Sequence, residues 1–167
     1  MTEVVVASVR RRLRVRGVVQ GVGFRPFAAR LAARHALAGY VLNDGGGVVV
    51  EVEGEPGAVA AFEAALRHEA PPLARVDAVE GRSLAPTGAA GFAILRSETS
   101  AGPAALVPPD AATCADCLRE IFDPRDRRYR YPFTNCTQCG PRFTIVRSVP
   151  YDRPRTTMAG FPLCPDC

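Results

Sequence analysis

A strand, a glycine turn and the start of a helix follow one another in the segment Arg14-Val15-Arg16-Gly17-Val18-Val19-Gln20-Gly21-Val22-Gly23-Phe24-Arg25-Pro26. Its first residues alternate between apolar or small side chains and arginines, which is the period of a half-buried strand. Gly21 and Gly23 permit positive φ and leave the backbone amides around them uncovered. Pro26 suits the first turn of a helix, where no N–H is needed. A tight turn without a ligand would explain the glycines alone. Bare amides at a helix N-terminus beside an arginine favour an anion site formed by Gly21, Val22, Gly23, Phe24 and Arg25.

The apolar periodicity of residues 9–97 predicts an α+β fold. We expect helices at 26–36 and 56–68, a hairpin turn at 43–47, and strands at 9–17, 39–42, 48–53, 74–82 and 92–95. Val48, Val50 and Val52 should share the buried face of their strand. The resulting β-α-β-β-α-β order is the split pattern of a ferredoxin-like sandwich.

Composition excludes several kinds of chemistry. All 21 basic residues are arginines, so neither a Schiff-base lysine nor the lysine of a Walker-type phosphate loop is present. The net charge of +4 lacks the basic excess expected of a nucleic-acid-binding protein. No apolar run is long enough to span a bilayer, and Val4-Val5-Val6 precedes the arginines, the reverse of a signal peptide. We therefore expect a cytoplasmic protein without a membrane partner.

The six cysteines form three Cys-x-x-Cys pairs beyond residue 113. The pairs Cys114/Cys117 and Cys136/Cys139 are 18 residues apart, a spacing typical of a four-thiolate zinc site. Four sulfur ligands leave no open position on the metal, so we expect structural Zn²⁺ whose removal spares chemistry elsewhere. Incidental thiols are the alternative. Cys164 and Cys167 are interpreted as half of a second zinc site, with free, disulfide-linked or adventitiously metallated thiols all open.

Residues 97–113 are rich in proline and glycine and predict a linker. We place the first domain at 1–97, the linker at 98–113 and the zinc-finger region, with its second module truncated, at 114–167. Within that region, residues 123–135 mix arginines with aromatic residues. Such a mixture can bind single-stranded nucleic acid. A docking face for another protein segment is the interpretation we favour.

Residues 17–25, Gly-Val-Val-Gln-Gly-Val-Gly-Phe-Arg, resemble the phosphate loop of the acylphosphatase family. That family pairs the loop with a Gly-aromatic-Val-x-Asn motif, which Gly39-Tyr-Val-Leu-Asn43 matches. The resemblance covers residues 9–97. It implies a ferredoxin-like sandwich in which Arg25 binds the transferring phosphoryl group and Asn43 positions the attacking water.

A second resemblance extends through the cysteine region. Its motifs are similar to those of the carbamoyltransferases of NiFe-hydrogenase maturation, and they lie at residues 108–114, 129–136, 139–145 and 151–158. Members of that family carry an acylphosphatase domain, two zinc modules, and then nucleotide-binding and transferase domains that have no counterpart in residues 1–167. The resemblance implies hydrolysis of carbamoyl phosphate as the first step of carbamoyl transfer to the partner protein HypE, on the route to the hydrogenase cyanide ligand. ATP and Mg²⁺ would serve only the missing C-terminal domains.

Two other functions remain open at this stage. One is a stand-alone acylphosphatase of broad specificity with a structural zinc tail. The other is a zinc-dependent nucleic-acid-binding module, which the modest net charge disfavours.

Overall fold

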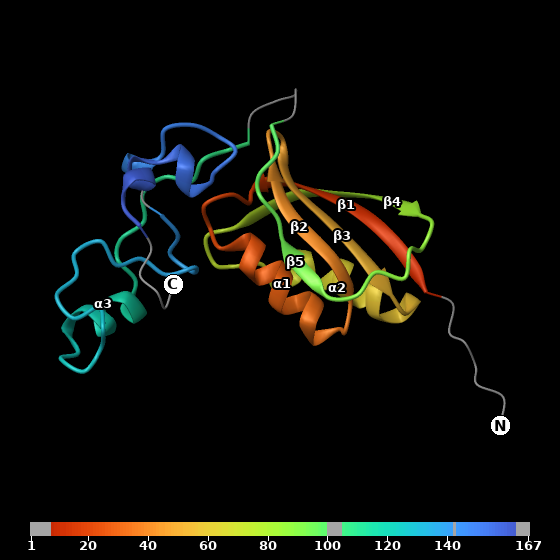
Figure 1. Ribbon diagram of the computed structural model, residues 1–167, viewed down its shortest axis with the longest axis horizontal. Coiled ribbons are helices and arrows are strands. Elements are labelled where there is room, and N and C mark those ends of the chain that lie inside the picture. Colours follow the sequence, from red (N-terminus) through yellow and green to blue (C-terminus); the bar gives the residue numbers. More distant parts are fainter. Residues whose placement is uncertain (1–7, 100–104, 142, 163–167) are drawn as a thin grey trace.

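The computed structural model describes residues 8–99, 105–141 and 143–162. Its first part is a five-stranded sheet with two helices, and its second part is a finger region built around one short helix (Figure 1). The elements are β1 Val9–Val18, α1 Phe24–Arg34, β2 Ala38–Asp44, β3 Gly47–Gly54, α2 Pro56–His68, β4 Arg75–Leu84, β5 Phe92–Ile94 and α3 Ala115–Phe122. Three short 3₁₀ turns follow at Phe143–Ile145, Arg153–Arg155 and Thr157–Gly160.

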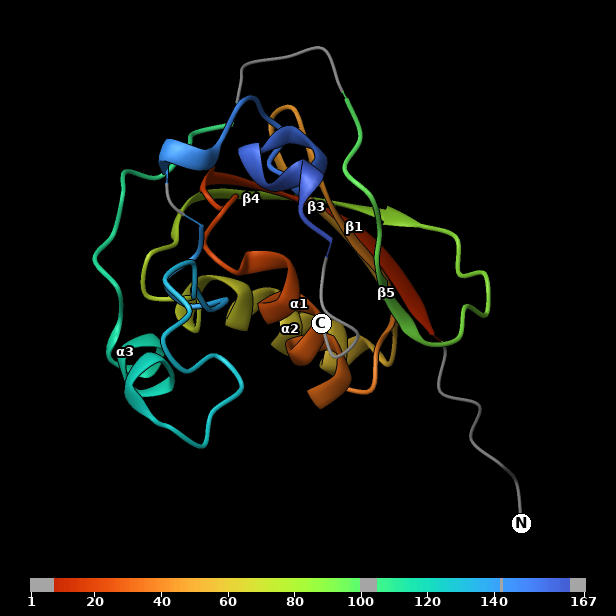
Figure 2. The same cartoon turned by 60° about the vertical axis from the view of Figure 1, so that its left-hand side comes forward.

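The strands are arranged in the order β4-β1-β3-β2-β5. The first four are antiparallel to their neighbours, whereas β5 pairs parallel to β2. Because β3 is inserted between β1 and β2, the β1-α1-β2 unit is split, as the predicted ferredoxin-like pattern requires. The predicted fold class is confirmed. Both helices cover one face of the sheet (Figure 2).

The core lies between that face and the helices. Leu13 and Val15 of β1, together with Val48, Val50 and Val52 of β3, point into it, which confirms the predicted alternation. The helices contribute apolar side chains at helical spacing, namely Phe24, Phe27, Ala28, Leu31 and Ala32 of α1 and Val59, Phe62, Ala65 and Leu66 of α2. This packing fixes β1, α1 and β2 relative to one another and so holds both ends of the predicted phosphate site.

The opposite face of β3 buries two carboxylates. Glu51 accepts hydrogen bonds from Arg10 and from the Tyr40 hydroxyl. The backbone amides of Thr87 and Gly88 donate to Glu53 and lower its pKa. Buried carboxylates must be paired or hydrogen-bonded, and both of these are.

Several element boundaries differ from the prediction. Helix α1 begins at Phe24 rather than Pro26, because Gly23 has φ +75° and serves as its N-cap. Strand β2 continues through Asp44, so that Asn43 belongs to the strand and only Gly45 and Gly46 form the turn. Helix α3 has no counterpart in the prediction.

Candidate functional site

The predicted phosphate loop connects β1 to α1. Gly21 and Gly23 both adopt left-handed backbone conformations, with φ of +70° and +75°. Among the described residues, no acceptor is hydrogen-bonded to the amides of residues 21–25. The first N–H groups of α1 point out of the helix and carry its positive partial charge. The loop is therefore a set of free donors grouped around one small volume, the arrangement that holds phosphate oxygens.

Arg25, in the first turn of α1, extends its guanidinium to the same place. Its side chain is only 16% exposed. Nη2 donates to the Tyr151 carbonyl oxygen at 3.2 Å, Nη1 lies 3.5 Å from Ser97 Oγ, and the Asp152 carboxylate is 3.7 Å away. The arginine is thus held in one position by partners that are weaker than a bidentate anion.

Asn43 is 1% exposed and faces the helices from β2. Its Nδ2 donates to the Tyr151 carbonyl at 2.8 Å, so Asn43 and Arg25 share one acceptor atom. Its Oδ1 has no hydrogen-bond partner among the described residues. A buried acceptor without a donor is costly, and an incoming water can supply that donor. The structure brings the two predicted catalytic residues together.

Gln20 connects the segments that carry Arg25, Asn43 and Tyr151. Its Nε2 donates at 2.7 Å to the carbonyls of Asp44 and Gly47, and its Oε1 accepts from the Tyr151 amide at 2.7 Å. One buried amide therefore joins the phosphate loop, the β2–β3 hairpin and a segment more than 130 residues away. Gln20 lies within the quoted motif, and no role was predicted for it. A lone polar residue in the apolar run Val18-Val19-Gln20-Gly21-Val22 was the available signal.

Tyr151 and Asp152 are site residues that the sequence analysis did not identify. The Asp152 carboxylate is held by the Ser97 amide and hydroxyl. Burial raises the pKa of the Tyr151 phenol above its usual value. Both residues lie within the expected zinc-finger region, in the motif at 151–158, and no local pattern connects them to residues 21–43.

A cavity of about 220 Å³ contains the site. The loop, Arg25 and Asn43 form one side, and the finger residues Asn135–Thr137, Gly140, Pro141 and Tyr151 form the other. The finger also touches the loop directly: a Cβ on Gly23 would lie 1.7 Å from the Thr137 carbonyl oxygen. The expectation of separate modules joined by a linker did not include this contact.

The four predicted zinc ligands converge in the finger. Cys114 caps α3 and Cys117 lies in its first turns, while Cys136 and Cys139 are on the facing loop. Their Sγ atoms all lie within 4.8 Å of one another, with contacts of 3.6 Å and 3.8 Å. A tetrahedron with metal–sulfur bonds of about 2.3 Å has edges of about 3.8 Å, so the four sulfurs fit a Zn²⁺ ion.

The surroundings of the cysteines support the same conclusion. Burial and the neighbouring thiols raise the pKa of the Cys117 thiol, and burial raises that of Cys136. Several thiolates can therefore share this volume only if a cation neutralises them. Cys164 and Cys167, the predicted half-site, lie outside the described residues.

The basic and aromatic segment 123–135 exposes Tyr129, Tyr131 and Phe133. The rings of Tyr131 and Phe133 pack edge to face, with centroids 5.8 Å apart. Arg128 is paired with Glu120 at 3.1 Å, which reduces the positive charge available to a nucleic acid. The interpretation as a protein docking face stays a prediction.

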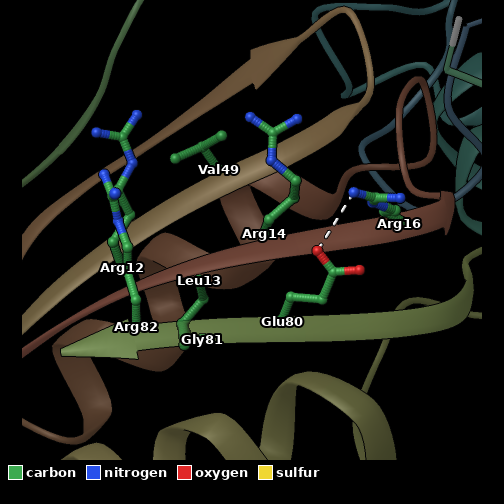
Figure 3. Close-up of a pocket in the computed structure, with 8 residues that line it drawn as sticks. All are labelled: Arg12, Leu13, Arg14, Arg16, Val49, Glu80, Gly81 and Arg82. Atoms are coloured by element: carbon green, nitrogen blue, oxygen red, sulfur yellow. Dashed lines mark hydrogen bonds and ion pairs between the residues drawn. The ribbon is translucent and has the colours of Figure 1, made fainter. Parts of the chain in front are cut away.

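A larger hollow of about 420 Å³ lies on the open face of the sheet, away from the motif residues (Figure 3). Arg12, Arg14, Arg16 and Arg82 reach into it beside one acid, Glu80. Arg14 pairs with Asp44 and Arg16 with Glu80. Arg12 and Arg82 stand opposite each other on β1 and β4 and form no ion pair with any described residue. The hollow is a strongly cationic surface.

No helix in the described part of the chain is long and apolar enough to cross a membrane.

Comparison with known proteins gives two family matches. Residues 11–94 match the acylphosphatase family, and residues 113–146 match the HypF finger. An acylphosphatase of Nocardioides sp. is 46% identical over 81 residues, which are 48% of this chain and 81% of that protein.

Longer matches include carbamoyltransferases. HypF2 of Cupriavidus necator is 56% identical over 159 residues, which are 94% of this chain and 20% of that protein. A crystal structure of full-length HypF in a phosphate- and nucleotide-bound form superposes with a TM-score of 0.94 at 43% identity. The superposition covers 99% of this chain and 22% of that chain. The chain thus spans about one fifth of the length of these carbamoyltransferases.

We predict one tightly bound Zn²⁺ per chain, held by Cys114, Cys117, Cys136 and Cys139. Elemental analysis of freshly purified, reduced protein should give a zinc-to-protein ratio near one. Cys139→Ser should lower the zinc affinity by at least about tenfold, because a buried thiolate ligand is lost. A wild-type protein that contains no metal after purification in the presence of Zn²⁺ would contradict the assignment.

Asp152→Asn should tighten the binding of inorganic phosphate. The Asp152 carboxylate lies beside Arg25 and repels an incoming anion, and the amide keeps the shape without the charge. A partly exposed charge interaction of about 0.4–1 kcal/mol corresponds to a two- to fivefold lower Kd. Isothermal titration calorimetry would measure it, with Asp123→Asn as a control on an exposed acid of the finger. Weaker phosphate binding by Asp152→Asn would show that the carboxylate instead holds the site together.

Arg82→Thr should stabilise the fold, because like charges directly opposite each other in a sheet are unfavourable. We expect the free energy of unfolding in urea to rise by about 0.2–1 kcal/mol. Arg16→Thr is the matched control, since it removes a paired arginine on the same face. Equal effects of the two substitutions would indicate that repulsion between Arg12 and Arg82 is negligible.

Proposed function

The chain belongs to the acylphosphatase family and carries a HypF finger, and on that basis we propose that it hydrolyses a small acyl phosphate, with carbamoyl phosphate as the physiological substrate. The observation that supports this most directly is the convergence of the free amides of residues 21–25, the Arg25 guanidinium and the unpaired Asn43 oxygen on one cavity. Together, these groups can supply what phosphoryl transfer to water requires of a protein, namely stabilisation of the anion and alignment of the nucleophile.

Arg25 and the loop amides would hold the equatorial oxygens of the transferring phosphoryl group. The donors are fixed before substrate arrives, so no reorganisation is needed as charge develops. The substrate would replace the Tyr151 carbonyl and the Asp152 carboxylate as the partners of Arg25. A guanidinium can donate two parallel hydrogen bonds to a phosphate, whereas it makes single contacts to the atoms that it now touches.

Asn43 would align the water. Its Oδ1 can accept a hydrogen bond from the water, and its Nδ2 holds the side chain in place. An amide is not a base at neutral pH, so Asn43 would orient the water without deprotonating it. No general acid is needed, because the carboxylate or carbamate is already a good leaving group.

We further propose that this hydrolysis is the first step of carbamoyl transfer in NiFe-hydrogenase maturation. The support is that the longer relatives are named carbamoyltransferases. The step would release phosphate and carbamate. Activation of carbamate by ATP and Mg²⁺, and transfer to HypE, are functions we assign to a full-length protein of that kind.

Zn²⁺ would have a structural role. Four cysteine sulfurs saturate a tetrahedral ion, so the metal would hold the finger and supply no water or Lewis acid to the reaction. None of the four described cysteines forms a disulfide, which suits a reducing compartment, and we propose a cytoplasmic location.

Arg25→Ala should lower kcat/KM for carbamoyl phosphate and acetyl phosphate by about 100-fold or more, because a contact to the transition state is lost. Asn43→Ala should lower kcat with a smaller effect on the Kd for inorganic phosphate, since it acts on the water. Released phosphate would be measured, and circular dichroism would verify folding.

Arg30→Ala provides the control, as it removes an exposed arginine from the same helix. If Arg25→Ala retained wild-type turnover, the assignment of the phosphate loop would be wrong.

A further inference from the structure

The phosphate loop and the finger touch through their backbones at two points. The first is the approach of Gly23 to the Thr137 carbonyl oxygen. At the second point, a glycine of the finger approaches the backbone of the loop: a Cβ on Gly140 would lie 1.9 Å from the Gly21 carbonyl oxygen. Neither glycine could carry a side chain without one backbone moving away from the other. The two contacts are two residues apart in the loop and three residues apart in the finger, so they form one continuous interface.

The finger's half of this interface is part of the cysteine cluster. Thr137 lies between Cys136 and Cys139, and Gly140 follows directly. The Cys139 amide points at Cys136 Sγ at 3.5 Å, and the Gly140 amide donates to the Cys136 carbonyl at 2.9 Å. One backbone conformation therefore has two results. It brings Thr137 and Gly140 to the loop, and it places the sulfurs of Cys136 and Cys139 where they can bind the same ion.

The finger has little else to hold it in shape. Beyond residue 105, few described side chains are buried, and two of them are Cys117 and Cys139. A module of this kind depends on its metal for folding. The loop's half is equally dependent on contacts, because Gly21 and Gly23 have the backbone freedom of glycine and the amides of residues 21–25 have no partner among the described residues.

We propose that the finger is a positioning element of the anion site, so that phosphate at residues 21–25 and a metal ion at the four cysteines stabilise each other's binding. The inference rests on the proposed function, in that the loop binds the phosphoryl group and the cysteines bind the ion. It goes beyond that function by making two sites with no shared ligand energetically coupled. Thr137 and Gly140 are positioning residues, because they act on the substrate only through the loop.

Coupling of this kind is reciprocal: if the metal raises the affinity for phosphate, then phosphate raises the affinity for the metal by the same factor. Typical couplings are about five- to 150-fold. The reciprocal direction gives a measurement that does not involve catalysis. We therefore expect removal of the metal to weaken phosphate binding, whereas the sequence analysis predicted that its removal would spare the phosphatase site.

The experiment measures the Zn²⁺ affinity of the chain by competition with a chromophoric chelator, in inorganic phosphate and in chloride at equal ionic strength. We expect phosphate to raise the affinity of the wild-type protein at least about fivefold. Arg25→Ala reports any direct effect of phosphate on the metal or the chelator, because its loop lacks the main phosphate ligand. It should show no increase.

Gly140→Ala tests the interface itself. Its added Cβ meets the Gly21 carbonyl, so the phosphate-dependent increase should disappear even if the zinc affinity in chloride also changes. Gly88→Ala is the matched control: Gly88 has a similar φ, +70° against +63°, and nothing within 4 Å of an added Cβ. It carries the same backbone strain without a collision and should retain the increase.

Calorimetric titration of the wild-type protein with phosphate, before and after removal of zinc, completes the test and requires no variant to fold. We expect the Kd for phosphate to rise at least about fivefold in the zinc-free protein. An unchanged Kd would overturn the inference and leave the proposed function standing. Absence of phosphate binding by the zinc-loaded protein would instead overturn the proposed function.

Discussion

The close approach of two backbones, between the phosphate loop and the cysteine finger, is the constraint on which the rest of the site depends. A loop that binds an anion through its amides must leave those amides free, and so cannot be held by the hydrogen bonds that fix most turns. Here van der Waals contact with a second segment holds it from outside, and the contact is possible only because glycine occupies the facing positions. Gln20 supplies the complementary hold from inside, through three hydrogen bonds of 2.7 Å.

The electrostatics of the site follow from the same arrangement. Arg25 is mostly buried, yet its charge is balanced by a carboxylate at 3.7 Å and by neutral oxygens. These partners keep the guanidinium oriented without binding it as strongly as a phosphate would. The unpaired Asn43 oxygen has the opposite character, because it is a buried acceptor that only an incoming molecule can satisfy. The site is therefore preorganised for an anion and a water together.

Much of the first domain could be predicted from the sequence because its signals are local. Each element was predicted from its own residues: β1 and β3 from alternation, α1 and α2 from helical spacing, and the start of α2 from a proline. The order of these elements then implied the topology. Asn43 and Arg25 were found through a motif, and the cysteine quartet through its spacing. Tyr151, Asp152 and Thr137 could not be found in this way. They reach the site by a tertiary contact between segments more than 100 residues apart, and the groups that Tyr151 and Thr137 bring are backbone carbonyls, which every residue possesses. The contact of Gly140 with the loop could not be predicted either, because a glycine at this position is equally consistent with an ordinary turn.

The exclusive use of arginine has a chemical consequence for the acyl phosphate substrate that we propose. Such compounds are acylating agents, and an unprotonated lysine amine is one of the side-chain nucleophiles that they can modify. Arginine keeps its proton at any physiological pH and its electron pairs are delocalised, so it attracts the phosphate without attacking the acyl carbon. With 21 arginines and no lysine, the chain can place positive charge beside the proposed substrate, at Arg25 above all, without adding a lysine amine that the substrate could acylate.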